Sequence, residues 1–167
     1  CQPEPVVQPD DSSSVESVVV TRNRLLVSTL SNVKSRLYSF CWRKGNWEKA
    51  LVATPELGSI RLSSTDVWSD QYFYYYEDFV TPSALYFADA STGTQKLIKS
   101  MPAYFDGGKY RVWQHQAVSK DGTKVPYFVV GPESMKNDGS NPTILYAYGG
   151  FEVSRIPNYL DDWGRGW

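Results

Sequence analysis

The residue types in this 167-residue sequence limit the nucleophilic and metal chemistry that it could perform. His115 is the single histidine, so a site with several histidine ligands is impossible, and any serine–histidine–aspartate triad would depend on this residue. The G-x-S-x-G sequence, which presents a nucleophilic serine on a sharp strand-to-helix turn, does not occur in the chain. The residues therefore indicate no multi-histidine metal site and no nucleophile of this type.

The two cysteines, Cys1 and Cys41, are too few for a disulfide framework. A cysteine at the first position, followed by a polar run with two prolines, fits a mature lipoprotein held at a membrane through its thiol. The alternative is that the sequence simply begins there. We expect a cytoplasmic or periplasmic location and no membrane partner unless Cys1 is lipidated.

The composition indicates a folded, β-rich chain. Lys and Arg number 17 and Asp and Glu number 18, a formal net charge of −1, which lacks the basic footprint of a nucleic-acid-binding protein. The hydrophobic share of 41% is too high for a disordered chain. Aromatic residues make up 15% of the sequence, including 12 tyrosines, and favour β structure.

An internal repeat organises the first part of the chain. Residues 25–28 align with residues 73–76 at an offset of 48, and the same offset aligns residues 35–38 with residues 83–86. A period near 50 with four strands per copy is typical of a β-propeller, in which each blade buries its faces against its neighbours. A plain β-sandwich is the alternative.

These observations predict a domain plan. After an irregular lead-in at residues 1–17, two blades are expected at 18–58 and 59–103. The tyrosine-rich strand near residue 74 is expected to pack between blades or to form an exposed strand face. It is not expected to stack on ligands.

The composition changes near residue 104, and longer strands are predicted beyond it. Asp121 and Gly122 form the centre of a predicted hairpin turn. The apolar residues 142–148 are predicted to form a strand that runs into Gly149 and Gly150. A strand ending in a glycine pair can bring the backbone close to a ligand. Residues 161–167 could begin a helix.

The sequence from Tyr146 to Phe151, Tyr-Ala-Tyr-Gly-Gly-Phe, resembles the prolyl oligopeptidase family of serine peptidases. The hairpin at residues 119–126 is similar to the first hairpin of that family's hydrolase domain. The run at residues 81–86 is similar to the end of its seven-bladed propeller. The resemblance covers about residues 8–167.

The resemblance implies a mainly β chain: about two blades of a partial β-propeller, followed by the first strands of an α/β-hydrolase domain at residues 104–167. It implies peptide hydrolysis through an acyl-enzyme, after proline in the best-known members, and it implies no metal site and no cofactor. The expected partner is a short peptide that the propeller admits to the active site.

The resemblance also assigns candidate site residues. Tyr148 matches the tyrosine whose hydroxyl donates to the oxyanion, Phe151 matches an apolar wall of the proline pocket, and Gly149 and Gly150 let the turn pass close to substrate. From the residues alone, Tyr148 could equally pack on a sheet, Phe151 could belong to a core, and the glycines could form an ordinary turn.

The family's nucleophile, acid and base have no counterpart in this sequence. In α/β-hydrolases the triad follows the oxyanion region in the order Ser, Asp, His, whereas His115 precedes Tyr148. We therefore interpret His115 as a structural strand residue and expect the chain alone to be inactive. The alternatives are a non-catalytic, truncated family member that acts as a β-rich binding module, and an oligopeptidase of the same superfamily with another specificity.

Overall fold

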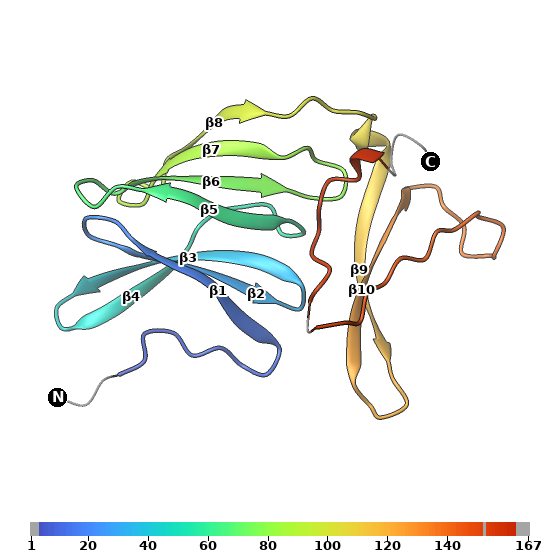
Figure 1. Ribbon diagram of the computed structural model, residues 1–167, viewed down its shortest axis with the longest axis horizontal. Coiled ribbons are helices and arrows are strands. Elements are labelled where there is room, and N and C mark those ends of the chain that lie inside the picture. The colour runs from blue at the N-terminus through green and yellow to red at the C-terminus, as the bar shows by residue number, and fades with distance from the viewer. Residues whose placement is uncertain (1–3, 152, 163–167) are drawn as a thin grey trace.

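The structure, a computed structural model that describes residues 4–151 and 153–162, consists of two four-stranded antiparallel sheets and a separate two-stranded hairpin (Figure 1). The first sheet contains, in order, β1 (Ser13–Val20), β2 (Leu25–Ser31), β3 (Lys34–Arg43) and β4 (Asn46–Leu51). The second contains β5 (Ser59–Thr65), β6 (Gln71–Glu77), β7 (Ala84–Asp89) and β8 (Gln95–Ser100). The short 3-10 turn η1 (Gly107–Lys109) leads into β9 (Tyr110–Val118) and β10 (Lys124–Pro132).

The two sheets repeat the same architecture, as the sequence repeat predicts. In both sheets, consecutive strands are neighbours, and the first strand carries a register irregularity opposite the second. The last strands, β4 and β8, are exposed along their whole length, whereas the middle strands, β2 and β3 in the first sheet and β6 and β7 in the second, hold most of the buried residues. This pattern is that of two propeller blades within a mainly β chain, and it confirms the predicted fold class for this part.

The first strand begins earlier than the sequence suggested. Ser13 pairs with Ser31 and Val15 pairs with Thr29, so β1 occupies part of the stretch 1–17 that was expected to be irregular. The expectation was wrong here because strands pair through their backbone groups, so a polar stretch can join a sheet without an apolar pattern. The serines and Glu16 lie on a largely exposed strand, where an apolar alternation is not needed.

The core lies between the blades. Leu26 and Leu37 from the first blade belong to one buried cluster with Tyr72, Tyr74 and Tyr76 from β6. Each of these tyrosines is 2% exposed, so this tyrosine-rich strand packs between blades, one of the two readings offered by the sequence. Their rings supply a large apolar area to a face that one four-stranded sheet could not bury alone.

Two of the buried tyrosines, Tyr74 and Tyr76, have hydrogen-bond partners for their hydroxyl groups. The Tyr74 hydroxyl donates to Gln95 at 2.6 Å, and its ring stacks on Tyr86 with centroids 5.1 Å apart. The Tyr76 hydroxyl donates to Asp78 at 3.0 Å. Burial raises the pKa of Tyr72 to about 12, and it also raises the pKa values of Tyr74 and Tyr76. These phenols therefore stay neutral and act as core residues.

Asp70 joins the two blades at one end. Its side chain accepts hydrogen bonds from the Thr21 hydroxyl at 2.8 Å, from the Asn23 backbone at 2.8 Å and from the Asn23 amide at 2.9 Å. Burial by itself would raise the pKa of Asp70. The hydrogen bonds from Asn23 and Thr21 and the nearby Arg24 guanidinium outweigh that effect, so the pKa lies below its usual value. The carboxylate therefore stabilises the fold in its charged form.

Replacing Asp70 with Asn should weaken the junction between the blades. Hydrogen bonds to a charged group contribute about 1.5–3 kcal/mol, so we expect a loss of about that size in the free energy of unfolding at pH 7. The pKa of the folded carboxyl lies below the unfolded value of about 3.9, so the difference should shrink as the pH falls through the folded pKa. Urea unfolding followed by tryptophan fluorescence measures both effects.

The matched control is Asp138→Asn, since Asp138 also accepts hydrogen bonds, but only from Ser140 in its own exposed loop. This variant should leave the unfolding midpoint unchanged. Equal losses for both variants, or an Asp70→Asn deficit that is independent of pH, would contradict the role given to Asp70.

Candidate active-site segment

The hairpin of β9 and β10 leads the chain from the blades toward the candidate site. The turn between the strands is the predicted one: Gly122 has a φ of +86°, and the Ser119 amide donates to the Thr123 carbonyl at 2.8 Å. Two contacts fix the hairpin on the blades. The Gln114 side chain donates to the Asn32 carbonyl, and the Phe79 and Phe128 rings lie 5.0 Å apart.

His115 lies within β9, directly across the ladder from Tyr127 of β10. The two rings are 5.5 Å apart and tilted by 36°. Within the described residues, no group of three or more His, Cys, Asp or Glu side chains could hold a metal ion. His115 thus takes part in a cross-strand ring pair, and its purely structural role stays a prediction.

The stretch 142–148, predicted as a strand, pairs with no strand in the described part of the chain. Its apolar residues lie at the surface, and Leu145 is 92% exposed. The strand prediction is wrong for this structure because a ladder needs a neighbour with free backbone groups. The sheet that precedes this stretch in the sequence is the hairpin of β9 and β10, and residues 142–148 do not join it as a third strand.

The candidate residues Tyr148, Gly149, Gly150 and Phe151 follow as an exposed bend. The Val153 amide donates to the Gly150 carbonyl at 3.2 Å, and Phe151 has a φ of +55°. A Cβ atom at Gly150 would lie 3.1 Å from the Tyr148 hydroxyl oxygen, so glycine permits this close approach. No heavy atom lies within 4 Å of the corresponding position at Gly149.

These four residues are adjacent, but they do not enclose a pocket. The Tyr148 side chain is 44% exposed and Phe151 is 93% exposed. The Phe151 ring thus forms no wall within the described residues, and its proposed role in a proline pocket stays a prediction. The Tyr148 hydroxyl belongs to a partly exposed side chain, and its role as an oxyanion donor stays a prediction.

Arg155 is a neighbour of Tyr148 that no sequence motif singled out. Its guanidinium carbon lies 4.6 Å from the centroid of the Tyr148 ring and 5.3 Å from that of Tyr146. A guanidinium over an aromatic face is attracted by the ring quadrupole. Arg155 therefore restricts the two tyrosine side chains that precede the glycine pair.

Beyond Arg155, residues 156–160 return to the second blade. The Ser59 hydroxyl donates to the Pro157 carbonyl, the Tyr159 amide donates to Glu77 at 3.1 Å, and the Leu160 amide donates to the Phe79 carbonyl at 3.1 Å. We call residues 156–160 the return strap. Figure 1 shows it, in red, running from the hairpin back toward the second blade.

Tyr159 anchors the return strap. It is 8% exposed, and its ring stacks on Phe105 with centroids 5.2 Å apart. Its hydroxyl accepts a hydrogen bond from the Tyr104 amide at 2.8 Å. The bend at Tyr148 is thus bracketed in sequence by two attachments to the blades, the hairpin before it and the return strap after it.

The model of the N-terminal β-propeller domain of prolyl oligopeptidase matches residues 2–101. The chain belongs to the prolyl oligopeptidase family. The strands that follow the blades, β9 and β10, are accordingly the first strands of the hydrolase domain that accompanies the propeller in this family. Among the described residues, no helix is long and apolar enough to span a membrane. The exact domain boundaries and the site roles remain predictions.

Relatives of known sequence and structure agree with this membership. The uncharacterized peptidase y4nA of Sinorhizobium fredii is 48% identical over 166 residues, which are 98% of this chain and 23% of that protein. A solved prolyl endopeptidase shares 34% identity at a TM-score of 0.79, over 92% of this chain and 22% of that one. A post-proline cleaving enzyme from Rickettsia typhi shares 27% identity at a TM-score of 0.79, over 97% of this chain and 23% of that one. The chain thus spans less than a quarter of the length of these proteins.

Replacing Tyr159 with Ala should release the return strap, because the ring stack and the hydrogen bond from Tyr104 are lost together. We expect cleavage by trypsin after Arg155 to become at least about tenfold faster, since a protease needs a locally opened substrate. Limited proteolysis with mass spectrometry measures the rate at this bond.

Tyr159→Phe is the control, because it keeps the ring stack on Phe105 and removes only the hydroxyl. It should give a smaller increase in cleavage. Equal cleavage rates for the wild type and Tyr159→Ala would show that Tyr159 does not anchor the strap.

Proposed function

We propose that this chain forms the last propeller blades and the first hydrolase strands of a serine-type oligopeptidase that cleaves short peptides after proline. The observation that carries the proposal is the exposed bend of Tyr148, Gly149 and Gly150, presented next to two propeller blades in a chain of this family. The names of two solved relatives, a prolyl endopeptidase and a post-proline cleaving enzyme, support the specificity.

The proposed mechanism is acyl transfer. A serine attacks the scissile carbonyl, a histidine moves the proton, and an aspartate orients the histidine; all three would come from the remainder of the enzyme. Tyr148 would donate its hydroxyl proton in a hydrogen bond to the oxyanion, where negative charge develops. Gly150 allows the phenol to lie close to the backbone, and Phe151 would form an apolar wall against the proline ring of the substrate.

Tyr148→Phe, made in the complete protein that contains this chain, should lower kcat/KM for a chromogenic Gly-Pro anilide by about 10²–10³. The change removes only a hydroxyl that acts on the transition state, so the loss should fall mainly on kcat rather than on KM. Steady-state kinetics with Gly-Pro, Gly-Ala and Gly-Arg anilides measure the effect and the preference together.

Tyr146→Phe is the matched control, because this tyrosine also packs against Arg155 but precedes the bend. It should change kcat/KM by less than about threefold. Full activity of Tyr148→Phe would exclude the oxyanion role, a preference for Gly-Arg would favour the alternative specificity, and no activity of the complete protein would favour the binding module.

The 167-residue chain by itself should not hydrolyse the Gly-Pro anilide, because the resemblance places the nucleophile, acid and base outside it. The purified chain, incubated with the anilide overnight, should release no more product than buffer. Turnover that survives further purification and is abolished by a serine-directed inhibitor would show that the chain holds its own nucleophile.

A further inference from the structure

A hollow of about 640 Å³ lies at the opposite end of the blades from the hairpin. Its wall includes the turn between β1 and β2, the adjoining ends of β3 and β4, and Asp70 of the second blade. The turn at the other end of β2 contacts β9 through Asn32. A seven-residue strand, about 20 Å long, therefore separates this hollow from the face where the hairpin attaches.

Three arginines line the hollow: Arg22, Arg24 and Arg43. This concentration is notable in a chain with a net charge of −1. The Arg24 Nε atom is buried and has no hydrogen-bond acceptor among the described residues. A buried donor without an acceptor is costly, so a ligand whose acceptor draws the Arg24 side chain toward the hollow would be favoured.

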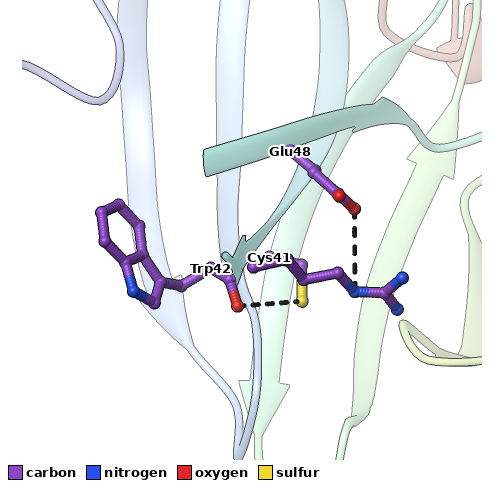
Figure 2. Close-up of polar contacts among 4 residues, drawn as sticks. Cys41, Trp42 and Glu48 are labelled. Atoms are coloured by element: carbon purple, nitrogen blue, oxygen red, sulfur yellow. Dashed lines mark hydrogen bonds and ion pairs between the residues drawn. The ribbon is translucent and has the colours of Figure 1, made fainter. Parts of the chain in front are cut away.

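The nearby acidic groups only partly offset the arginines. Both carboxylate oxygens of Asp70 already accept hydrogen bonds from Thr21 and Asn23. A Glu48 carboxylate oxygen lies 3.6 Å from Arg43 Nε and forms an ion pair with it. Figure 2 shows Glu48 beside Cys41 and Trp42. Among the residues that line the hollow, the three guanidinium groups outnumber the carboxylates, because Asp70 is the one acidic residue in that set.

Two indole side chains border the arginines. The Trp42 and Trp47 rings contact each other edge to face, with their centroids 5.3 Å apart. Both side chains line the hollow and remain partly exposed. Cys41 also lines the hollow, but it is largely buried, and its sulfur lies 3.9 Å from the Trp42 carbonyl oxygen. An anionic ligand with apolar neighbours, such as a short acidic peptide, suits a rim of this kind.

We propose that this hollow binds the carboxylate of a short acidic peptide, with Arg24 and Arg22 as its hydrogen-bond donors and the two indoles as its apolar rim. Guanidinium groups recognise planar carboxylates through paired N–H donors. The volume lies within the range of sites for small ligands. The site does not depend on the proposed peptidase activity, because it lies at the other end of the blades from the hairpin and uses none of the candidate catalytic residues.

The test is calorimetric titration of the chain with N-acetyl-Leu-Asp-Leu-amide at low salt, with the uncharged Leu-Asn-Leu peptide as the comparison. The Asp peptide should bind at least about tenfold more tightly than the Asn peptide, and its affinity should fall in 0.5 M salt because the charges are then screened. The 15N resonance of Arg24 Nε should shift on binding, which assigns the site.

Two substitutions, Arg22→Gln and Arg24→Gln, should each weaken binding of the Asp peptide at least about tenfold. Arg22 is exposed, so its replacement should not disturb the fold. Arg111→Gln is the control, because Arg111 lies on β9 and pairs with Glu133 at the surface. If Arg24→Gln fails to fold, Arg22→Gln decides the question. Equal binding of the two peptides, an unchanged affinity in Arg22→Gln, or stronger competition by inorganic phosphate than by acetate would overturn the proposal.

Discussion

The packing of one blade against the next is the interaction on which the rest of this chain depends. A four-stranded sheet has two faces and cannot cover both by itself. Leu26 and Leu37 cover one face of the first blade by contact with Tyr72 and Tyr74, and both tyrosines remain neutral in that cluster. Asp70 then fixes one end of the same interface by bonds to the first blade. The blades therefore act as one body to which later segments attach.

The attachments decide where the candidate catalytic bend can lie. The β9–β10 hairpin rests on loops of both blades, and the return strap inserts Tyr159 beside Phe105. Between these two anchors, the stretch that carries Tyr148 lies at the surface with its apolar residues exposed. Large exposed apolar patches are typical of surfaces that bind another part of a protein.

Sequence reasoning predicted the parts of the fold that depend on local pattern. The repeat at an offset of 48 residues predicted the two blades, and Asp121 with Gly122 predicted the hairpin turn. Both signals depend on residues close together in the sequence, namely the alternation of apolar residues along a strand and the residue types that a tight turn needs. It did not find the bonds from Thr21 to Asp70 or the contact between Arg155 and Tyr148. The first depends on residues 49 apart, and the second follows no known spacing rule. The strand predicted at 142–148 failed for a related reason, since an apolar pattern cannot supply the partner that a ladder needs.

The most direct test of the account is a crystal structure of the complete protein with a peptidyl boronate that ends in proline, a mimic of the tetrahedral intermediate. The account predicts that the Tyr148 hydroxyl oxygen lies about 2.7–3.1 Å from a boronate oxygen, with the Phe151 ring against the proline. A boronate whose oxygens are bound only by other groups, with Tyr148 pointing away from them, would contradict it.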